Sequence, residues 1–166
     1  MSQAFVKEPD GDAVADDQPE LPISRHANYV TAGGLALLKE SLAALIDQRR
    51  DLDGDDLVNK LPLSQIGREI RYYEARVKQA IPVDPDQQPP GEVAFGAEVT
   101  VEDEDGEAKT YRIVGEDEAD PDHGKVSWVS PLAKALIDAR AGDLVIWERP
   151  TGEIELEIIS IAYPKT

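Results

Sequence analysis

Three aspartates surround a glycine in the polar stretch between two apolar-patterned segments of the chain. Asp53 precedes Gly54, and Asp55 and Asp56 follow it. A carboxylate is the side-chain group that hard divalent cations such as Mg²⁺ prefer. Aspartate is also a common turn former, so the same residues are typical of a solvated loop. The spacing alone leaves both interpretations open.

The chain also carries a group of arginines in an otherwise acidic context: Arg49, Arg50, Arg68 and Arg71. One interpretation is a basic patch that binds a partner. The other is a set of surface ion pairs with nearby carboxylates, which contribute little to stability. Those carboxylates are Asp47, Asp51, Glu69 and Glu74.

Other patterns of catalytic residues are absent from the sequence. There is no cysteine, which excludes disulfide bonds and thiol catalysis. His26 and His123 are isolated and have no partner at metal-ligand spacing. Nothing resembles a nucleophile elbow, a phosphate-binding loop or a zinc site. We therefore expect no enzyme activity of its own, no cofactor and no stably bound metal.

The aspartates lie between two segments whose apolar residues alternate in spacings of three and four. The first segment carries Leu35, Leu38, Leu42, Leu45 and Leu52, with Arg49 in the intervening position, and the second carries Leu63, Ile66, Ile70, Tyr73, Val77 and Ala80. Such spacing forms a heptad seam. Thr31 suits a helix N-cap, and Gly54 and Pro62 end and restart helices. The pattern predicts an antiparallel coiled-coil hairpin over residues 29–81.

The composition changes on both sides of the hairpin. Residues 1–28 are acidic and poor in apolar groups, so we expect a disordered tail, and the Pro-rich residues 82–92 predict an extended linker. Over residues 93–166 the apolar period switches to two, with a turn at Asp105-Gly106 and a short helix opened by Ser130-Pro131. The predicted fold class is α+β: the helical hairpin is followed by an antiparallel β domain with one short helix.

The charge balance limits the class of partner. The chain has 17 basic and 34 acidic residues and a net charge of -17. Free binding to DNA or RNA needs clustered basic residues, so no direct sequence-specific DNA contact is expected. A protein partner and plain solubility in an acidic proteome both fit.

No apolar run approaches the roughly 20 residues of a membrane span, and the N-terminus lacks a signal core. We expect a cytoplasmic monomer that does not bind membranes.

A series of short motifs follows in order along the C-terminal half. They are Phe95-Gly96-Ala97, Tyr111-Arg112-Ile113-Val114-Gly115, Glu116-Asp117-Glu118-Ala119-Asp120, Gly124, Ser127, Ser130-Pro131-Leu132-Ala133, Ala135-Leu136, Gly142-Asp143 and Pro150-x-Gly152. Their order and spacing resemble the C-terminal domain of the Gre transcript-cleavage factors of bacterial RNA polymerase. Tyr29-Val30-Thr31-x-x-Gly34 resembles the start of the Gre coiled coil. The resemblance implies an FKBP-like fold for residues 93–166 and RNA polymerase as the partner.

By this resemblance, the hairpin would enter the secondary channel of the polymerase. Asp53, Asp55 and Asp56 would then help hold the second Mg²⁺ of the polymerase and stimulate cleavage of backtracked RNA. The tip departs from the family pattern, because Val58 stands in place of a glutamate and an acid–tyrosine pair is missing. The arms are also shorter than in the cleavage factors. The alternative is a factor that occupies the channel without cleavage and competes with Gre factors.

The resemblance also implies contact surfaces. The expected docking residues are Trp128, Val129, Ser130, Pro131 and Leu132. An exposed apolar patch suits docking, although Trp128 and Leu132 are equally typical of a core. The basic patch would meet nascent RNA or acidic residues of the polymerase.

Two hypotheses of other classes are a prolyl isomerase, which needs an aromatic pocket, and a general coiled-coil adaptor.

Overall fold

The structure, a computed structural model, describes residues 18–52 and 54–165. These residues divide into two compact units. One, which we call the hairpin unit, contains the described residues up to Arg25 together with Lys39–Lys78. The other, the sheet unit, contains His26–Leu38 and the chain from Gln79 onward. One boundary falls between Arg25 and His26, and the other two fall within helices and not in the Pro-rich stretch at residues 82–92.

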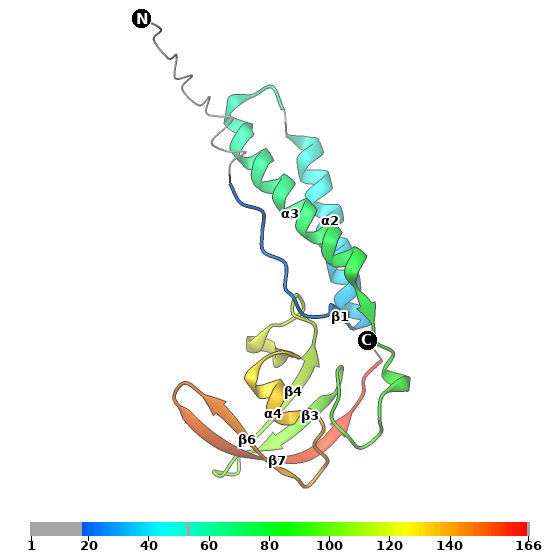
Figure 1. Cartoon of the computed structure of the whole chain (residues 1–166), viewed down its shortest axis with the longest axis vertical. Coiled ribbons are helices and arrows are strands. Elements are labelled where there is room, and N and C mark those ends of the chain that lie inside the picture. The colour runs from blue at the N-terminus through cyan, green and yellow to red at the C-terminus, as the bar shows by residue number, and fades with distance from the viewer. Residues whose placement is uncertain (1–17, 53, 166) are drawn as a thin grey trace, which may run out of the picture. The chain divides into compact units, whose positions relative to one another are not determined.

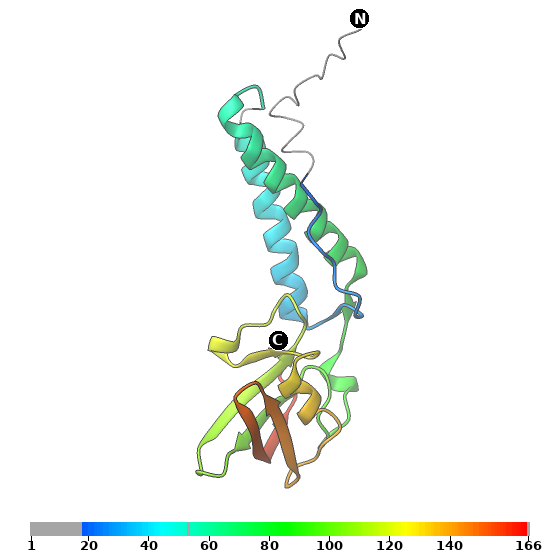
Figure 2. The same ribbon diagram turned by 60° about the vertical axis from the view of Figure 1, so that its left-hand side comes forward.

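Two helices form the hairpin, as the heptad seams predict. α2 spans Ala32–Asp51 and α3 spans Lys60–Gln79, and they lie side by side (Figures 1 and 2). The seam of α3 is visible in its burial, since Ile70 is 2% exposed. Pro62 lies in the first turn of α3, where its missing N–H removes no helical hydrogen bond. No helix in the described part of the chain is long and apolar enough to cross a membrane.

The segment before the hairpin is expected to be disordered over residues 1–28, of which 1–17 lie outside the described residues. From Gln18 the structure differs from that expectation. Gln18–Arg25 runs alongside α3 in both ribbon views (Figures 1 and 2), and Glu20 is paired with Arg71. The partner lies 51 residues away in the sequence, so local composition could not reveal this contact.

The sheet unit holds a five-stranded sheet. Its strands are β3 (Glu98–Glu102), β4 (Ala108–Val114), β5 (Lys125–Ser127), β6 (Leu144–Arg149) and β7 (Gly152–Ala162). Their order is β5-β4-β3-β7-β6. The prediction of a purely antiparallel sheet was wrong for one pair, because β5 runs parallel to β4. Parallel neighbours need a crossover connection, and the chain from Gly115 to Gly124, with the 3₁₀ helix η3 (Pro121–His123), supplies it.

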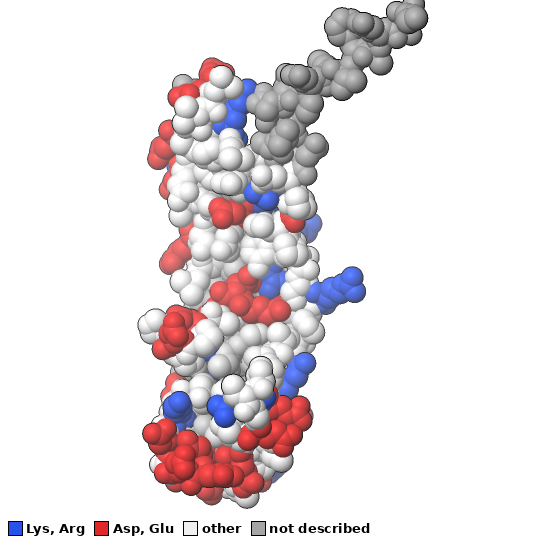
Figure 3. Space-filling view, turned by 90° about the vertical axis from the view of Figure 1, so that its left-hand side faces the viewer, with Lys and Arg blue, Asp and Glu red and all other residues white. Residues whose placement is uncertain are grey.

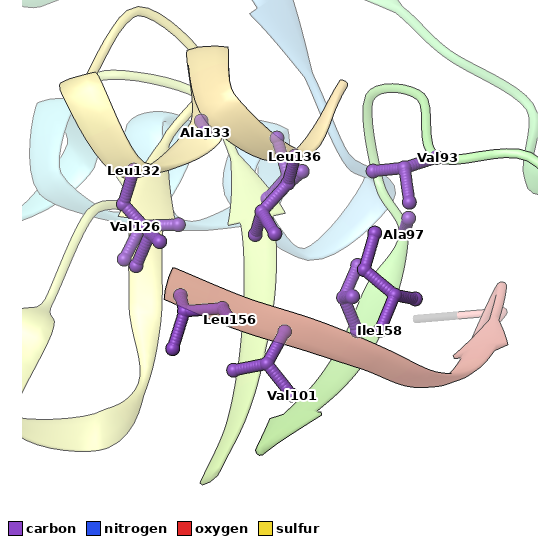
Figure 4. Close-up of a cluster of buried hydrophobic side chains, with 11 residues drawn as sticks. Val93, Ala97, Val101, Val126, Leu132, Ala133, Leu136, Leu156 and Ile158 are labelled. Carbon is purple, nitrogen blue, oxygen red and sulfur yellow. The ribbon is translucent and has the colours of Figure 1, made fainter. Parts of the chain in front are cut away.

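The core of the sheet unit lies between this sheet and the short helix α4 (Pro131–Leu136). Val99 and Val101 of β3 and Leu156 and Ile158 of β7 are buried, as strand alternation requires. The register between β3 and β7 shifts beside Thr100, which is a β-bulge and locally bends the sheet. Figure 4 shows Leu132, Ala133 and Leu136 of α4 facing strand residues such as Leu156 and Ile158.

A second, smaller sheet joins the two ends of the hairpin. β1 (Tyr29–Val30) pairs in parallel with β2 (Ile81–Pro82). The Ile81 N–H donates to the Asn28 carbonyl at 2.8 Å, and the Val83 N–H donates to the Val30 carbonyl at 3.0 Å. Strands of two residues have no measurable periodicity, so sequence patterns did not reveal them.

The stretch expected to be an extended linker, residues 82–92, is largely folded. It contains the 3₁₀ helix η2 (Pro85–Gln87), which Asp84 caps by accepting from the Asp86 N–H at 2.9 Å. The Gln88 side-chain amide donates to the Phe95 carbonyl at 2.7 Å. This stretch is therefore part of the sheet unit.

Candidate functional site

The hairpin tip consists of the loop between α2 and α3 and the 3₁₀ helix η1 (Leu57–Asn59). Asp55 and Asp56 are both exposed, and Asp53 lies outside the described residues. One oxygen of Asp56 accepts a hydrogen bond from the Val58 N–H at 3.1 Å and so caps η1. Asp56 therefore has a local structural role that the sequence did not reveal.

Two apolar side chains stand beside these carboxylates. Leu57 is 76% exposed and Val58 is 79% exposed. By resemblance to the Gre family, Val58 stands where a glutamate is expected, and in the structure it forms a strongly exposed apolar pair with Leu57. The tip thus offers a mixed surface of carboxylates and apolar groups.

In the described residues, no three or more histidine, aspartate or glutamate side chains are arranged to hold a metal ion. Mg²⁺ is bound in near-octahedral geometry by several oxygen ligands. A carboxylate such as that of Asp55 can therefore contribute one ligand to an ion whose other ligands come from a partner molecule.

The four arginines of the predicted basic patch lie at two levels of the hairpin. Arg49 and Arg50 are in the last turn of α2, whereas Arg68 and Arg71 are near the middle of α3. Arg50 pairs with Asp47 three residues earlier, which is one of the local pairings that the sequence left open. The patch is therefore better treated as two separate pairs.

The pair on α3 is bound by the chain that precedes the hairpin. The Arg71 guanidinium donates two hydrogen bonds to the Glu20 carboxylate, from Nε at 2.8 Å and from Nη2 at 2.7 Å. Arg68 donates from Nη1 to the Pro19 carbonyl at 3.2 Å. Sequence reasoning offered Glu69 and Glu74 as partners and missed Glu20, because no local pattern connects Glu20 to α3.

Of the five expected docking residues, Trp128 and Val129 are half-buried. The Trp128 ring packs edge-on against Tyr29, with ring centroids 5.0 Å apart, and against His26 at 5.8 Å. Trp128 also packs on the hydrophobic core. Its side chain therefore has a packing role within the sheet unit.

The other three expected docking residues open α4. Ser130 caps the helix by accepting from the Ala133 N–H at 3.2 Å, as its position before proline predicts. Pro131 is exposed. Leu132 is 3% exposed and belongs to the core, because the first turn of α4 directs it toward the sheet. Of these residues, Pro131 is thus the one that is fully on the surface.

Pro131 borders a groove of about 500 Å³ in the sheet unit. Its lining is mostly apolar and consists of Tyr111, Pro121, Val126, Ser130, Pro131, Leu132, Trp147, Glu148, Arg149, Pro150 and Thr151. The Tyr111 and Trp147 rings lie 6.4 Å apart and nearly perpendicular, and the Arg149 guanidinium lies 5.3 Å from the Trp147 ring centroid. Residues from the strands β4, β5 and β6, from η3 and from the start of α4 thus combine into a surface that no single sequence motif describes.

A strongly acidic surface adjoins this groove. Tyr111, Trp147 and Arg149 also line a second hollow, whose carboxylates are Asp103, Glu104, Asp105, Glu107, Glu153 and Glu155. Figure 3 shows acidic side chains gathered on the surface of the sheet unit. A phosphate backbone would be repelled there.

A buried carboxylate fixes the first turn of α2 within the sheet unit. The Thr31 hydroxyl donates to Glu118 Oε1 at 2.5 Å and accepts from the Gly34 N–H at 2.9 Å. The Glu118 side chain is 5% exposed, and its other oxygen lies 3.9 Å from the Lys125 ammonium. Thr31 was predicted as an N-cap, and the structure confirms this and adds Glu118 as its partner.

Two glycines make close approaches in the same region possible. A Cβ on Gly34 would lie 2.5 Å from Glu118 Oε1, and a Cβ on Gly115 would lie 2.5 Å from the Tyr29 carbonyl oxygen. Both glycines belong to the motifs noted in the sequence, which was the available signal, but their contacts span more than 80 residues and required the structure.

Comparisons with known proteins agree with these observations. The family model described as "Transcription elongation factor, GreA/GreB, C-term" matches residues 88–163. Transcription elongation factor GreB of Neisseria meningitidis serogroup B is 37% identical over 155 residues, covering 83% of this chain and 95% of that protein. Transcription elongation factor GreA of Anaeromyxobacter sp. is 36% identical over 151 residues, covering 81% of this chain and 91% of that protein.

Among solved structures, the GreA/GreB elongation factor from Nitrosomonas europaea has 21% sequence identity and a TM-score of 0.42, covering 84% of this chain and 100% of that chain. The sequence relatives carry the assignment, because the similarity extends over nearly their whole length. The chain belongs to the GreA/GreB family of transcription elongation factors.

Proposed function

We propose that this protein binds RNA polymerase beside its secondary channel and regulates elongation through the hairpin tip. Family membership supports the elongation role. The observation that carries the proposal is the tip itself, where the exposed Asp55 and Asp56 stand beside the exposed pair Leu57 and Val58 at the end of a helical hairpin. The resemblance to Gre factors implies that this end of the hairpin enters the channel.

We favour regulation by occupancy of the channel over stimulation of transcript cleavage. The carboxylate of Asp56 is engaged in capping η1, and Val58 has no oxygen to offer a metal. Hard cations need oxygen ligands, so this tip is poorer in them than the Gre pattern. The apolar side chains of Leu57 and Val58 suit contact with the protein surface that lines the channel, because such contact removes them from water.

Transcript cleavage is the second candidate, and Asp55 favours it. Its side chain is exposed and could join Asp53 in completing the ligands of a polymerase-bound Mg²⁺. A carboxylate ligand on a second metal would help activate water for attack on a phosphodiester.

For docking, we propose the groove bordered by Pro131. Its size, its aromatic pair Tyr111 and Trp147 and its mostly apolar lining suit apolar side chains of a protein partner. The adjoining acidic surface would favour basic residues around that contact. Together these features fit a protein surface better than a nucleic acid.

The decisive experiment measures RNA cleavage in backtracked elongation complexes at matched Mg²⁺, with the wild-type protein and with the Asp53→Ala/Asp55→Ala/Asp56→Ala variant. The favoured outcome is no acceleration by the wild-type protein, together with inhibition of an added cleavage-active Gre factor. Acceleration that the triple variant loses would establish the second candidate. If the wild-type protein neither accelerates cleavage nor inhibits the added Gre factor, at concentrations at which a Gre factor saturates the elongation complexes, the proposed function is refuted.

A further inference from the structure

The segment Gln18–Arg25, which we call the strap, makes a specific contact with α3. The Glu20 carboxylate accepts two hydrogen bonds from the Arg71 guanidinium, at 2.7 and 2.8 Å. One residue earlier, the Pro19 carbonyl accepts a bond from Arg68 at 3.2 Å. Arg68 and Arg71 lie one helical turn apart, so they present two donors to two consecutive residues of an extended chain.

Three features distinguish this contact from an incidental surface pair. A two-bond guanidinium–carboxylate fork has fixed geometry and is stronger than a single bond. Pro19 and Pro22 flank Glu20 and restrict the backbone, which lowers the entropy lost on ordering the strap. Leu21 is half-buried. The hydrogen bonds from Arg71 hold the pKa of Glu20 below its ordinary value of 4.5.

The contact is also replaceable. The Arg71 and Glu20 side chains are 55% and 61% exposed, and solvent-exposed ion pairs are weak and sensitive to salt. A competing carboxylate can therefore exchange with Glu20 without unfolding the hairpin. Because the strap is part of the same chain, it keeps the Glu20 carboxylate at a high local concentration beside Arg71.

We propose that the strap is a built-in competitor that occupies the Arg68–Arg71 surface of α3 until an acidic segment of a partner protein displaces it. The occupant on view is itself a peptide, bound by a side-chain carboxylate and a neighbouring backbone carbonyl, so the ligand class that fits is an acidic peptide segment. The protein has a net charge of -17, so a surface with two adjacent guanidinium groups is unusual in it. The strap covers the guanidinium groups of Arg68 and Arg71, and its release exposes them.

The inference deepens the proposed function, since the natural partner would be an acidic segment of the polymerase, but displacement can be measured without polymerase. The probe is a fluorescent hexaglutamate peptide, titrated at low salt against the full-length protein. The variants are Glu20→Gln, Glu20→Gln/Arg71→Gln, and Glu40→Gln as the control. Glu40 is exposed on α2, so its substitution makes the same change in net charge outside the strap.

We expect Glu20→Gln to bind the peptide about two- to fivefold more tightly than the wild-type protein, the effect of removing one exposed ion pair. Glu40→Gln should bind like the wild type, and Arg71→Gln should cancel the gain. Equal affinity of Glu20→Gln and wild type, an equal gain in Glu40→Gln, or no binding by any variant would overturn the proposal. A larger gain for a short oligouridine RNA than for hexaglutamate would overturn the assignment of the ligand as a peptide.

Polymerase binding separates this inference from the proposed function. If the wild type binds polymerase and Glu20→Gln binds no more tightly, the strap does not compete for polymerase and the proposed function stands. If no variant binds polymerase while Glu20→Gln still gains affinity for hexaglutamate, the proposed function fails and the strap mechanism stands.

Discussion

The hydroxyl of Thr31 lies 2.5 Å from a carboxylate oxygen of Glu118, a residue 87 positions later in the chain. The same oxygen lies 2.5 Å from the point that a Cβ on Gly34 would occupy. A negative charge at the N-terminus of a helix is favourable, because the helix dipole and the unpaired N–H groups there are positive. The Thr31–Glu118 contact therefore ties the start of the hairpin to the acidic run of the sheet unit.

Gly34→Ala is expected to lower the free energy of unfolding by about 1–3 kcal/mol, because the added Cβ would displace the buried Glu118 carboxylate from its hydrogen bond with the Thr31 hydroxyl. Helix propensity alone predicts the opposite, a gain of about 1 kcal/mol for alanine over glycine inside a helix. Urea denaturation of the full-length protein measures the difference.

Gly67→Ala is the matched control, since Gly67 lies in α3 and its added Cβ would meet Arg71 at an ordinary 3.4 Å. We expect it to be neutral or stabilising. In a Glu118→Ala background the loss caused by Gly34→Ala should shrink. A Gly34→Ala variant as stable as the wild type would contradict the role assigned to the close approach.

Val58→Glu is expected to raise cleavage of backtracked RNA on the order of tenfold, which corresponds to ~1.4 kcal/mol of transition-state stabilisation. The substitution supplies the carboxylate that the Gre pattern has at this position, at a site that is 79% exposed and tolerates a charge. Leu57→Glu adds the same group one residue away and serves as the control. If both variants, or neither, increase cleavage, the position of Val58 is not what limits the tip.

Pro131→Glu is expected to weaken binding to RNA polymerase roughly tenfold, because it places a charge at the border of the apolar groove proposed for docking. The helix itself should tolerate glutamate in its first turn. Lys134→Gln, an exposed change on the same helix away from the groove lining, should bind as the wild type does. Equal affinities of all three proteins would exclude this groove as the docking site.

Tyr163 predicts a loss of stability at alkaline pH. Its hydroxyl donates to the Glu92 carbonyl and accepts from the Ala94 N–H at 3.0 Å, and burial raises the pKa of Tyr163 above its ordinary value of 10.0. The folded state therefore binds the phenolic proton more tightly than the unfolded state. The corresponding stability is present below pH 10 and is lost as the pH rises through the raised pKa.

Tyr163→Phe removes both hydrogen bonds and is expected to cost about 1 kcal/mol at neutral pH. Its stability should also fall less steeply above pH 10 than that of the wild type, as measured by urea denaturation across the pH range. Parallel pH profiles of the two proteins would rule out Tyr163 as the titrating group.

Much of the fold could be predicted because its signals are local. The seam residues of α3, the N-cap of Thr31 and the opening of α4 at Ser130 each follow from spacings within a few turns. The parallel pairing of β4 with β5 did not, because it depends on a crossover whose direction no local pattern encodes.

The candidate site was less predictable, because it depends on contacts between residues that are distant in the sequence. The exposure of Pro131 and the burial of Leu132 depend on how α4 packs on the sheet, and the partners of Arg71 and Thr31 are distant in sequence. Asp56 was recognised as a turn residue in general, but which backbone N–H it caps became clear only from the conformation of η1.

The parallel pairing of β1 with β2 has an evolutionary consequence. The chain leaves the β1–β2 pair after Val30 and returns to it at Ile81, and hydrogen bonds join the two strands. The two arms between these strands can therefore gain or lose matched heptads while the strands that anchor them keep the same register. Such an arrangement allows the reach of the hairpin to diverge among relatives independently of the domain that carries it.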